Sequence, residues 1–210
     1  MKGDNISQQE VMRNYYRWHA SVYDATRWSF LFGRKALLRH LPIAFNAGQS
    51  LLEVGCGTGH NLRFLAKRHP NLRLIGLDVS TEMLTQTSKV MAPYSRQLQL
   101  FEQAYGATPL KLAQATDFVL FSYALTMFNP GWEAAIEQAW QDLKPGGRIA
   151  VVDFHKTPSG AFRWWMTQNH VRMDAHLLPF LQSKFRAELL EIHPAWLGLW
   201  QYFLYIGQKP

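Results

Sequence analysis

A cluster of glycines and carboxylates marks the part of this chain most suited to bind a ligand. The segment reads LLEVGCGTGHNLRFLAKRHPNLRLIGLDVS over residues 51–80, and its two apolar runs lead to Glu53 and Asp78. The glycines between them are Gly55, Gly57 and Gly59. Glycines in a turn between a strand and a helix let the backbone approach a ligand closely. A carboxylate at the end of the following strand can accept hydrogen bonds from both hydroxyls of a diol.

Two familiar nucleotide-binding loops do not fit this segment. No Lys-Ser/Thr pair follows the glycines, so the loop lacks the cation and the magnesium ligand of a phosphate loop. The glycine spacing is also tighter than the G-x-G-x-x-G pattern of dinucleotide-binding proteins, and His60 follows Gly59. The ligand is therefore expected to need close backbone contact and a carboxylate rather than a phosphate cradle.

Apolar strands alternate with helices through the middle of the chain. We predict strands at residues 51–54, 72–77, 98–103, 118–122 and 148–153. Helices are predicted at residues 59–68, 81–91 and 132–143, and Ser80 is suited to cap the second of them. This alternation is typical of a doubly wound, mostly parallel α/β sheet.

The two ends of the chain add further elements. Apolar stripes predict helices at residues 6–22 and 30–40 before the sheet, and at 162–169 and 172–181 after it. Residues 187–208 indicate two strands with a turn near residues 196–198, which would add an antiparallel edge. No linker interrupts the pattern, so we expect one domain over residues 1–210.

Composition indicates an ordinary globular protein with a basic surface. The 210 residues are 48% hydrophobic and carry a net charge of +7, which suits anionic partners or simply a solvated basic surface. Cys56 is the one cysteine, so no internal disulfide is possible and a reducing compartment is expected. No signal-peptide pattern begins the chain, and the apolar run at 195–207 is shorter than a membrane span. We expect a cytoplasmic protein, with membrane association left open.

Three motifs together resemble the class I S-adenosylmethionine-dependent methyltransferases. They are EVGCGTG at residues 53–59, GLDVS at 76–80 and LKPGGRIAVVDF at 143–154, in the order and spacing of that family. The resemblance implies a Rossmann-like methyltransferase fold, α/β and doubly wound, with a mostly parallel seven-stranded sheet and a terminal antiparallel hairpin. It divides the domain into a helical N-terminal lid (1–45), a cofactor-binding core (46–153) and substrate-side helices with the hairpin (154–210).

The same resemblance implies S-adenosylmethionine as cofactor and S-adenosylhomocysteine as product. The glycine turn would meet the cofactor's methionine part, Asp78 its ribose, and Val79 with Met83 the faces of its adenine; simple helix-core packing is the alternative for the last two. The cofactor-binding residues expected are Tyr23, Glu53, Gly55, Cys56, Gly57, Gly59, Asp78, Val79, Met83, Gln103 and Ser122.

One position departs from the family pattern. Many relatives place an aspartate after the third strand to accept the adenine amino group, where this chain has Tyr105. Glu102, Gln103 or a backbone carbonyl could take that place.

Catalytic residues are expected after the fourth and fifth strands, because parallel α/β sheets bind ligands beyond the carboxyl ends of their strands. The candidates are Tyr123, Asp153 and His155; a structural role lining the cleft is the alternative for each. His170, Asp174 and His176 have a spacing that could suit a metal. Methyl transfer needs none, so we assign no metal site.

Local sequence favours a small or amphipathic methyl acceptor. Residues 15–35 and 121–132 resemble lipid-head-group N-methyltransferases, and the general style is shared with ubiquinone and menaquinone methyltransferases. The acceptor could thus be the amine of a lipid head group, with peripheral membrane contact, or a quinone-type molecule methylated on carbon or oxygen. A non-catalytic cofactor-binding protein is a further alternative. The segment SYAL after the fourth strand lacks the N/D-P-P-Y/F motif of many nucleic-acid methyltransferases, so no nucleic-acid partner is expected.

Overall fold

A computed structural model describes residues 30–44, 48–106, 115–169 and 171–210. Its helices are α2 (Arg34–His40), α3 (His60–Arg68), α4 (Thr81–Val90), α5 (Trp132–Asp142), α6 (Gly160–Gln168) and α7 (Leu177–Lys184). Its strands are β1 (Ser50–Val54), β2 (Arg73–Asp78), β3 (Leu98–Glu102), β4 (Thr116–Ser122), β5 (Leu143–Phe154), β6 (Arg186–Ala195) and β7 (Trp200–Gln208). Short 3-10 turns are η1 (Ala92–Gln97), η2 (Leu125–Met127) and η3 (Trp196–Gly198).

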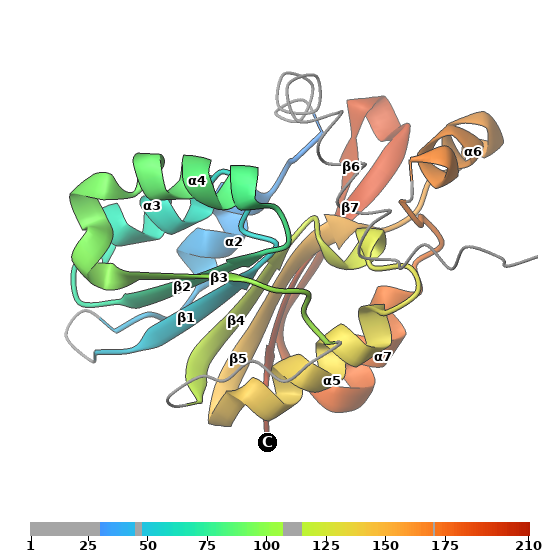
Figure 1. Ribbon diagram of the computed structural model, residues 1–210. Helices are drawn as coiled ribbons and strands as arrows, with labels where there is room; N and C mark the ends of the chain where they lie inside the picture. Colours follow the sequence, from blue (N-terminus) through green and yellow to red (C-terminus); the bar gives the residue numbers. More distant parts are fainter. Residues whose placement is uncertain (1–29, 45–47, 107–114, 170) are drawn as a thin grey trace, which may run out of the picture.

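The seven strands form one sheet in the order β3-β2-β1-β4-β5-β7-β6 (Figure 1). The first five are parallel to one another, and β7 pairs antiparallel with both β5 and β6. The chain winds outward from β1 to β3 and then returns to β4 beside β1. This confirms the expected α/β fold with its terminal antiparallel hairpin.

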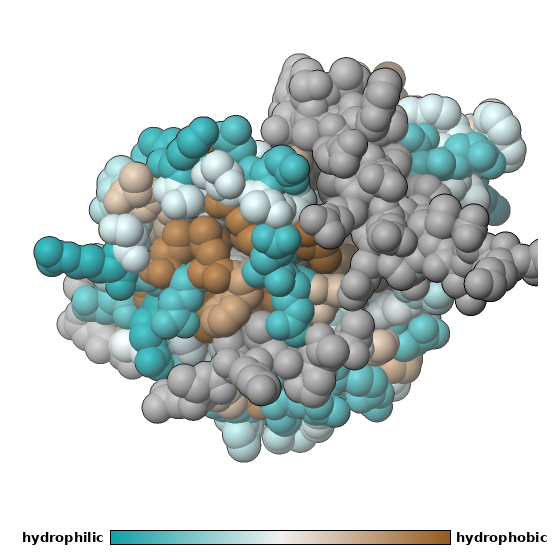
Figure 2. Space-filling model, in the orientation of Figure 1, coloured by the Kyte–Doolittle hydropathy of each residue, from teal (hydrophilic) through white to brown (hydrophobic). Residues whose placement is uncertain are grey.

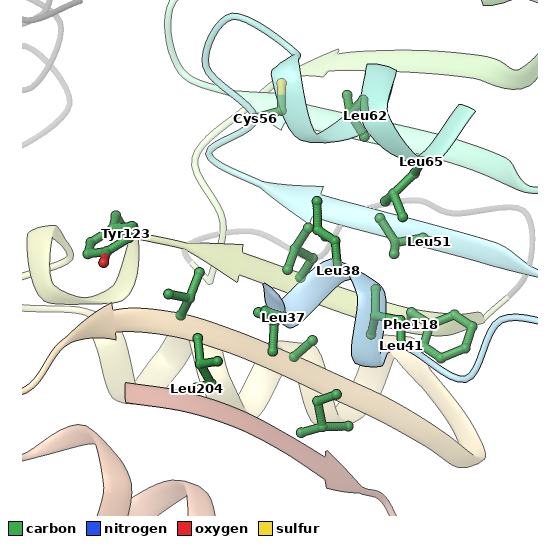
Figure 3. Close-up of a cluster of buried hydrophobic side chains, with 14 of the residues drawn as sticks. Leu37, Leu38, Leu41, Leu51, Cys56, Leu62, Leu65, Phe118, Tyr123 and Leu204 are labelled. Carbon is green, nitrogen blue, oxygen red and sulfur yellow. The ribbon is translucent and has the colours of Figure 1, made fainter. Parts of the chain in front are cut away.

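Helices cover both faces of the sheet and bury an apolar core on each. On one face α2 and α3 pack on the strands, and Figure 3 shows side chains of α2, among them Leu37 and Leu38, lying over the sheet near Leu51 and Phe118. On the other face α5 and α7 pack on a second cluster around Phe121. The sheet is therefore sandwiched between two helical layers, and ligands are left with its edges and strand ends.

The surface near β3, an edge strand of the sheet, has both polar and apolar areas. Figure 2 shows an apolar area beneath the polar surface of α4, on the side that carries β3. Phe101 of β3 is only half-buried and packs against the second core cluster.

The helix predicted at residues 172–181 is wrong in its first half. The segment before α7 is extended, because Asp174 forms a β-bridge with Lys156 and Ala175 donates a backbone hydrogen bond to His155 O at 2.8 Å. Ala175 has a φ of 62°, which a helix does not allow. Helix α7 starts only at Leu177.

Two other predicted boundaries also differ from those in the structure. The second predicted helix, 30–40, begins at Arg34 after Gly33, whose φ is 76°. Strand β5 begins at Leu143, before the start of the strand predicted at residues 148–153. The predicted helix at 6–22 and the lid residues up to 29 lie outside the described residues.

Candidate cofactor and acceptor site

The glycine turn lies where the sheet changes its direction of winding. Strand β1 has β2 on one side and β4 on the other, and the connections leaving β1 and β4 lead away from each other. Such a switch point leaves a crevice at the carboxyl ends of the strands, where doubly wound sheets bind ligands. Gly55 follows β1 there, and a Cβ added to it would lie 3.3 Å from Ala124 Cβ, just beyond β4. The two loops thus face each other closely.

The turn itself needs glycine at three positions. Gly55, Gly57 and Gly59 have φ values of 71°, 54° and 74°, which side chains rarely adopt. Thr87 of α4 donates a hydrogen bond to Gly57 O at 2.6 Å, and Gly57 N donates to Asp78 Oδ2 at 2.8 Å. Gly57 is therefore held from both sides, by α4 and by the end of β2.

Asp78 joins the ends of β1 and β2. Its Oδ2 accepts from Gly57 N and its Oδ1 from Ser80 N at 3.1 Å, while Ser80 caps α4 through Met83 N at 3.2 Å. Each carboxylate oxygen has two acceptor directions, a geometry that suits the two hydroxyls of a diol. The carboxylate is thereby fixed in place beside the glycine turn.

Glu53 and Cys56 support the turn from beneath. Glu53 is buried, and its Oε1 accepts from Asn61 Nδ2 of α3 at 2.7 Å, which ties β1 to that helix. Cys56 is buried, and burial raises the pKa of its thiol well above the ordinary value, with Glu53 adding to the shift. The thiol thus stays neutral at physiological pH. A Cβ on Gly76 would lie only 3.1 Å from Cys56 Sγ, so the sulfur fills close-packed space.

The expected adenine side lies at the ends of β2 and β3. Gln103 N donates to Asp78 O at 3.1 Å, Val79 is half-buried, and Met83 is buried at the start of α4. Tyr105 turns away from this edge into the core, where its hydroxyl donates to Asp142 Oδ2 of α5 at 2.7 Å. Its backbone position thus resembles that of an adenine-binding aspartate, but its side chain stabilises the α5 layer.

Ser122 supplies an observation that favours a ligand at the switch point. It ends β4, its side chain is buried, and its Oγ has no hydrogen-bond partner among the described residues. Buried hydroxyls are nearly always hydrogen-bonded, so a polar ligand group is a natural partner. With the strained glycine turn and the fixed carboxylate of Asp78, the residues present fit S-adenosylmethionine. Tyr23, the remaining expected contact, lies outside the described residues.

Tyr123 occupies a strained position next to Ser122. Its φ is 56°, and such values in non-glycine residues are concentrated at functional sites. Its hydroxyl donates to Phe32 O at 2.8 Å, and its ring meets Phe154 edge-on at 4.8 Å. Burial raises the pKa of Tyr123 well above 10, and the charge of Asp153 adds to the shift. Tyr123 therefore stays protonated and fixes the chain that leads into α2.

Asp153 is fully buried and its carboxylate is engaged. Thr126 donates to it from both its hydroxyl, at 2.5 Å, and its backbone N–H, at 3.2 Å, and Phe154 N donates at 2.8 Å. Burial raises the pKa of Asp153 to about 6, opposed by these bonds. The geometry indicates a positioning role: Asp153 holds η2, the turn after β4, against the end of β5.

Among the three catalytic candidates, His155 is the one with a basic nitrogen that no described residue bonds. Its ring is buried at 6.0 Å from Phe203, and Nδ1 has no hydrogen-bond partner among the described residues. Burial lowers the pKa of His155 below 6.5, and the neighbouring charge of Lys156 lowers it further. The imidazole is therefore neutral at physiological pH and able to accept a proton.

Several residues of this site were missed at the sequence level. Thr87, Asn61 and Thr126 each bond a site residue from a separate element. Their only sequence signal is a small polar side chain within an apolar pattern, which is too common to identify a role.

A chain of aromatic rings, also unpredicted, extends from Tyr123 to the hairpin turn. Phe154 lies 5.0 Å from Trp200, Trp200 5.9 Å from Phe32, and Phe32 6.5 Å from Trp196. Segments far apart in sequence thus contribute to one row of packed rings beside Tyr123.

The metal alternative finds no support in the described part of the chain. Asp174 accepts from Arg172 Nε at 2.7 Å and pairs with His176, while His170 lies outside the described residues. No group of three or more potential ligands gathers anywhere among the residues described.

Comparisons with known proteins agree with this geometry. Residues 51–147 match the family described as a methyltransferase domain. Trans-aconitate 2-methyltransferase of Deinococcus radiodurans is 28% identical over 155 residues, which are 74% of this chain and 50% of that protein. The ubiquinone/menaquinone biosynthesis C-methyltransferase UbiE of Syntrophotalea carbinolica is 27% identical over 64% of this chain and 57% of its own length. The chain spans about half the length of these curated relatives.

A solved structure extends the likeness to the whole chain. Haemonchus contortus phospholethanolamine N-methyltransferase 2, in complex with phosphomonomethylethanolamine and S-adenosylhomocysteine, superposes with a TM-score of 0.73 at 14% identity. It covers 100% of this chain and 62% of its own. At this identity the likeness concerns the fold.

The class expected from the sequence is thereby confirmed. This chain has the fold of the class I S-adenosylmethionine-dependent methyltransferases. Its residues 51–147, which contain the glycine turn, Asp78 and Ser122, match a methyltransferase domain.

Proposed function

We propose that this protein transfers a methyl group from S-adenosylmethionine to an amphipathic small molecule, and that the acceptor atom is the amine of a lipid head group. The observation that carries the proposal is the junction of Gly57 and Asp78 at 2.8 Å, at the switch point between β1 and β4. The aromatic rings beyond β4 and β5 favour an acceptor with an apolar part.

When bound, S-adenosylmethionine would supply a methyl group on its sulfonium sulfur. The acceptor atom would attack the methyl carbon in line, and the sulfur would leave as the thioether of S-adenosylhomocysteine. The residues of this chain mainly orient the reactants and exclude water. Asp78 and the glycine turn hold one side of the site, and Asp153 fixes the η2 turn on the other through Thr126. His155 Nδ1 takes the proton that a protonated acceptor must lose, because it is the unpartnered base on this side.

Titration of His155 tests this assignment of the base without a known substrate. Its imidazole resonances should titrate below pH 6.5, because burial and Lys156 disfavour the charged form. The Lys156→Gln variant should titrate at higher pH, since one of the two causes is removed. Nuclear magnetic resonance of both proteins checks this. A pKa at or above 6.5 in the parent protein would remove His155 as a base held neutral by its surroundings.

The acceptor is identified by following labelled methyl groups. Purified protein is incubated with methyl-labelled S-adenosylmethionine and a cell extract, and the products are separated into amine lipids, quinones and water-soluble compounds. Label in amine lipids, lost in the Asp78→Ala variant, is the expected result. Label confined to water-soluble compounds would overturn the proposal of an amphipathic acceptor. No label above that of the variant would favour a cofactor-binding protein without catalysis.

A quinone-type acceptor methylated on carbon or oxygen is the second candidate. The ring chain from Tyr123 to Trp196 favours it, since aromatic side chains can contact a flat aromatic head as well as an apolar tail. UbiE is among the relatives that match this chain. In the same experiment, label in the quinone fraction with none in amine lipids would establish this candidate in place of the first.

A further inference from the structure

Large apolar side chains are exposed where the β6–β7 hairpin turns and on the neighbouring helix α6. We call this surface the tip patch, and its members are Trp164, Trp165, Trp196, Leu197 and Leu199. Trp164 is 66% exposed, Trp196 56% and Leu197 109%. Most of the other described apolar side chains pack in the two cores, so a group of exposed tryptophan and leucine side chains is unusual.

The two halves of the patch are tied together. Thr157, just before α6, donates through Oγ1 to Leu199 O at 2.6 Å, and its own carbonyl accepts from Arg163 Nη2 of α6 at 2.8 Å. Phe30 lies 6.4 Å from both Trp165 and Trp200 and fills the space between them. In Figure 1, α6 and the end of the hairpin project from the same side of the sheet, above its body. The patch members therefore belong to two elements that are bonded to each other and project together.

The backbone of the tip is strained in a way that exposes these side chains. Trp196 and Leu197 have φ values of 47° and 55°, followed by Gly198 at 90°. Bulky residues are strained in the left-handed region. Turns of this kind are normally made by glycine, asparagine or aspartate. Leu197, which is fully exposed, contributes little to the core and indicates an external partner.

The charge around the patch indicates which partner it fits. Residues 156–168 and 194–202 contain the cations Lys156 and Arg163 and no carboxylate, and the whole chain carries +7. Asp174, which bridges to Lys156, is itself paired with Arg172. Exposed tryptophan and leucine flanked by cations are the combination that binds the interface of an anionic bilayer. None of the described helices is long and apolar enough to cross a membrane, so contact through a surface tip is the form available.

We propose that the tip patch docks this protein on an anionic lipid bilayer, with Trp196 and Leu197 inserted at the interface. The cations beside the patch and the absence of carboxylates in residues 156–168 and 194–202 favour an anionic surface over a second copy of this basic chain. The ring chain from Trp196 to Tyr123 then places the acceptor side of the methyltransferase site next to the membrane. Docking does not require methyl transfer, so it is measured without cofactor, and its failure is distinct from failure of the proposed function.

The test is sedimentation of the full chain with vesicles. The parent protein should bind phosphatidylcholine vesicles that contain phosphatidylglycerol, and less so those of phosphatidylcholine alone. Binding should weaken between about 0.1 M and 1 M salt, where the Debye length falls from about 10 Å to about 3 Å. The double variant Trp196→Ser, Leu197→Ser should bind at least about tenfold more weakly, because its inserted apolar area is removed.

A matched control separates the tip from exposed apolar surface in general. Leu190 and Ile192 of β6 are 41% and 46% exposed but lie on the strand rather than at the turn. The variant Leu190→Ser, Ile192→Ser should bind like the parent. Brominated lipid should quench tryptophan fluorescence more in the parent than in a Trp196→Phe variant, and that difference reports insertion of Trp196 among the eight tryptophans. Equal binding of the tip variant and the parent, or no vesicle binding by the parent, overturns the proposal. So does a parent dimer that the tip variant converts to a monomer, because the patch is then an interface between copies.

Discussion

Replacing Gly57 by valine is expected to abolish binding of S-adenosylmethionine while leaving the sheet folded. Gly57 has a φ of 54°, where a β-branched residue is strained by about 1–3 kcal/mol. The residue cannot relax easily, because its N–H is held by Asp78 and its carbonyl by Thr87. The added side chain then stands where the cofactor needs close approach to the backbone. Titration calorimetry measures the loss, and circular dichroism shows whether the fold persists.

Gly48 offers a control for backbone strain alone. Its φ is 57°, and an added Cβ would meet nothing within 4 Å. Gly48→Val therefore imposes a similar conformational penalty, in the loop before the amino end of β1. This variant should bind S-adenosylmethionine like the parent protein. Loss of binding in both variants to the same extent would show that strain, and not the position of Gly57, explains the effect.

Replacing Asp78 by alanine is expected to weaken S-adenosylmethionine binding by about 1.5–3 kcal/mol, or about 10- to 150-fold. The change removes the acceptor proposed for the ribose hydroxyls, and it frees Gly57 N and Ser80 N, which the carboxylate now holds. Both the ligand contact and the shape of the glycine turn are affected. Calorimetry at neutral pH gives the dissociation constant of the variant.

Asp117 provides a carboxylate of similar structural role at the other end of the sheet. Its Oδ2 accepts from Ser50 N at 2.8 Å at the start of β1, and it pairs with Lys144. Asp117→Ala should lower the free energy of unfolding while leaving cofactor affinity unchanged. If Asp78→Ala bound as tightly as the parent, the assignment of the ribose site to Asp78 would be wrong.

The central part of the fold could be predicted from the sequence because its signals are local. Each parallel strand is a short apolar run, and Ser80 caps α4 as its side chain type suggests. The glycine turn was identifiable for the same reason, since three positive φ values require glycine at those positions. The terminal hairpin could be predicted because two apolar segments flank a glycine.

The parts that were mispredicted depend on contacts between distant segments. The helical pattern at residues 172–176 is overridden by backbone bonds from Ala175 to His155 and from Arg172 to Thr126. Likewise, Asp153 ends the predicted strand at a position where a catalytic group is expected. Only the structure shows that Thr126 donates a hydrogen bond to its carboxylate. Sequence spacing places such residues at the right edge of the sheet but does not say which of them bond one another.

Local propensity also fails at the hairpin turn. Nothing in the sequence predicts left-handed φ values at Trp196 and Leu197, since both residues disfavour them. The antiparallel pairing of β6 with β7 imposes that turn.

An amide nuclear magnetic resonance titration with S-adenosylmethionine tests the central claim most directly, because it locates the cofactor on the chain. The account predicts that the largest shifts fall on the amides of Gly55, Gly57, Gly59 and Ser80, with smaller changes at Gln103 and Ser122. The amides of β6 and of the tip patch should not move. Saturable binding with its largest shifts away from the glycine turn, or no binding at millimolar cofactor, would contradict it.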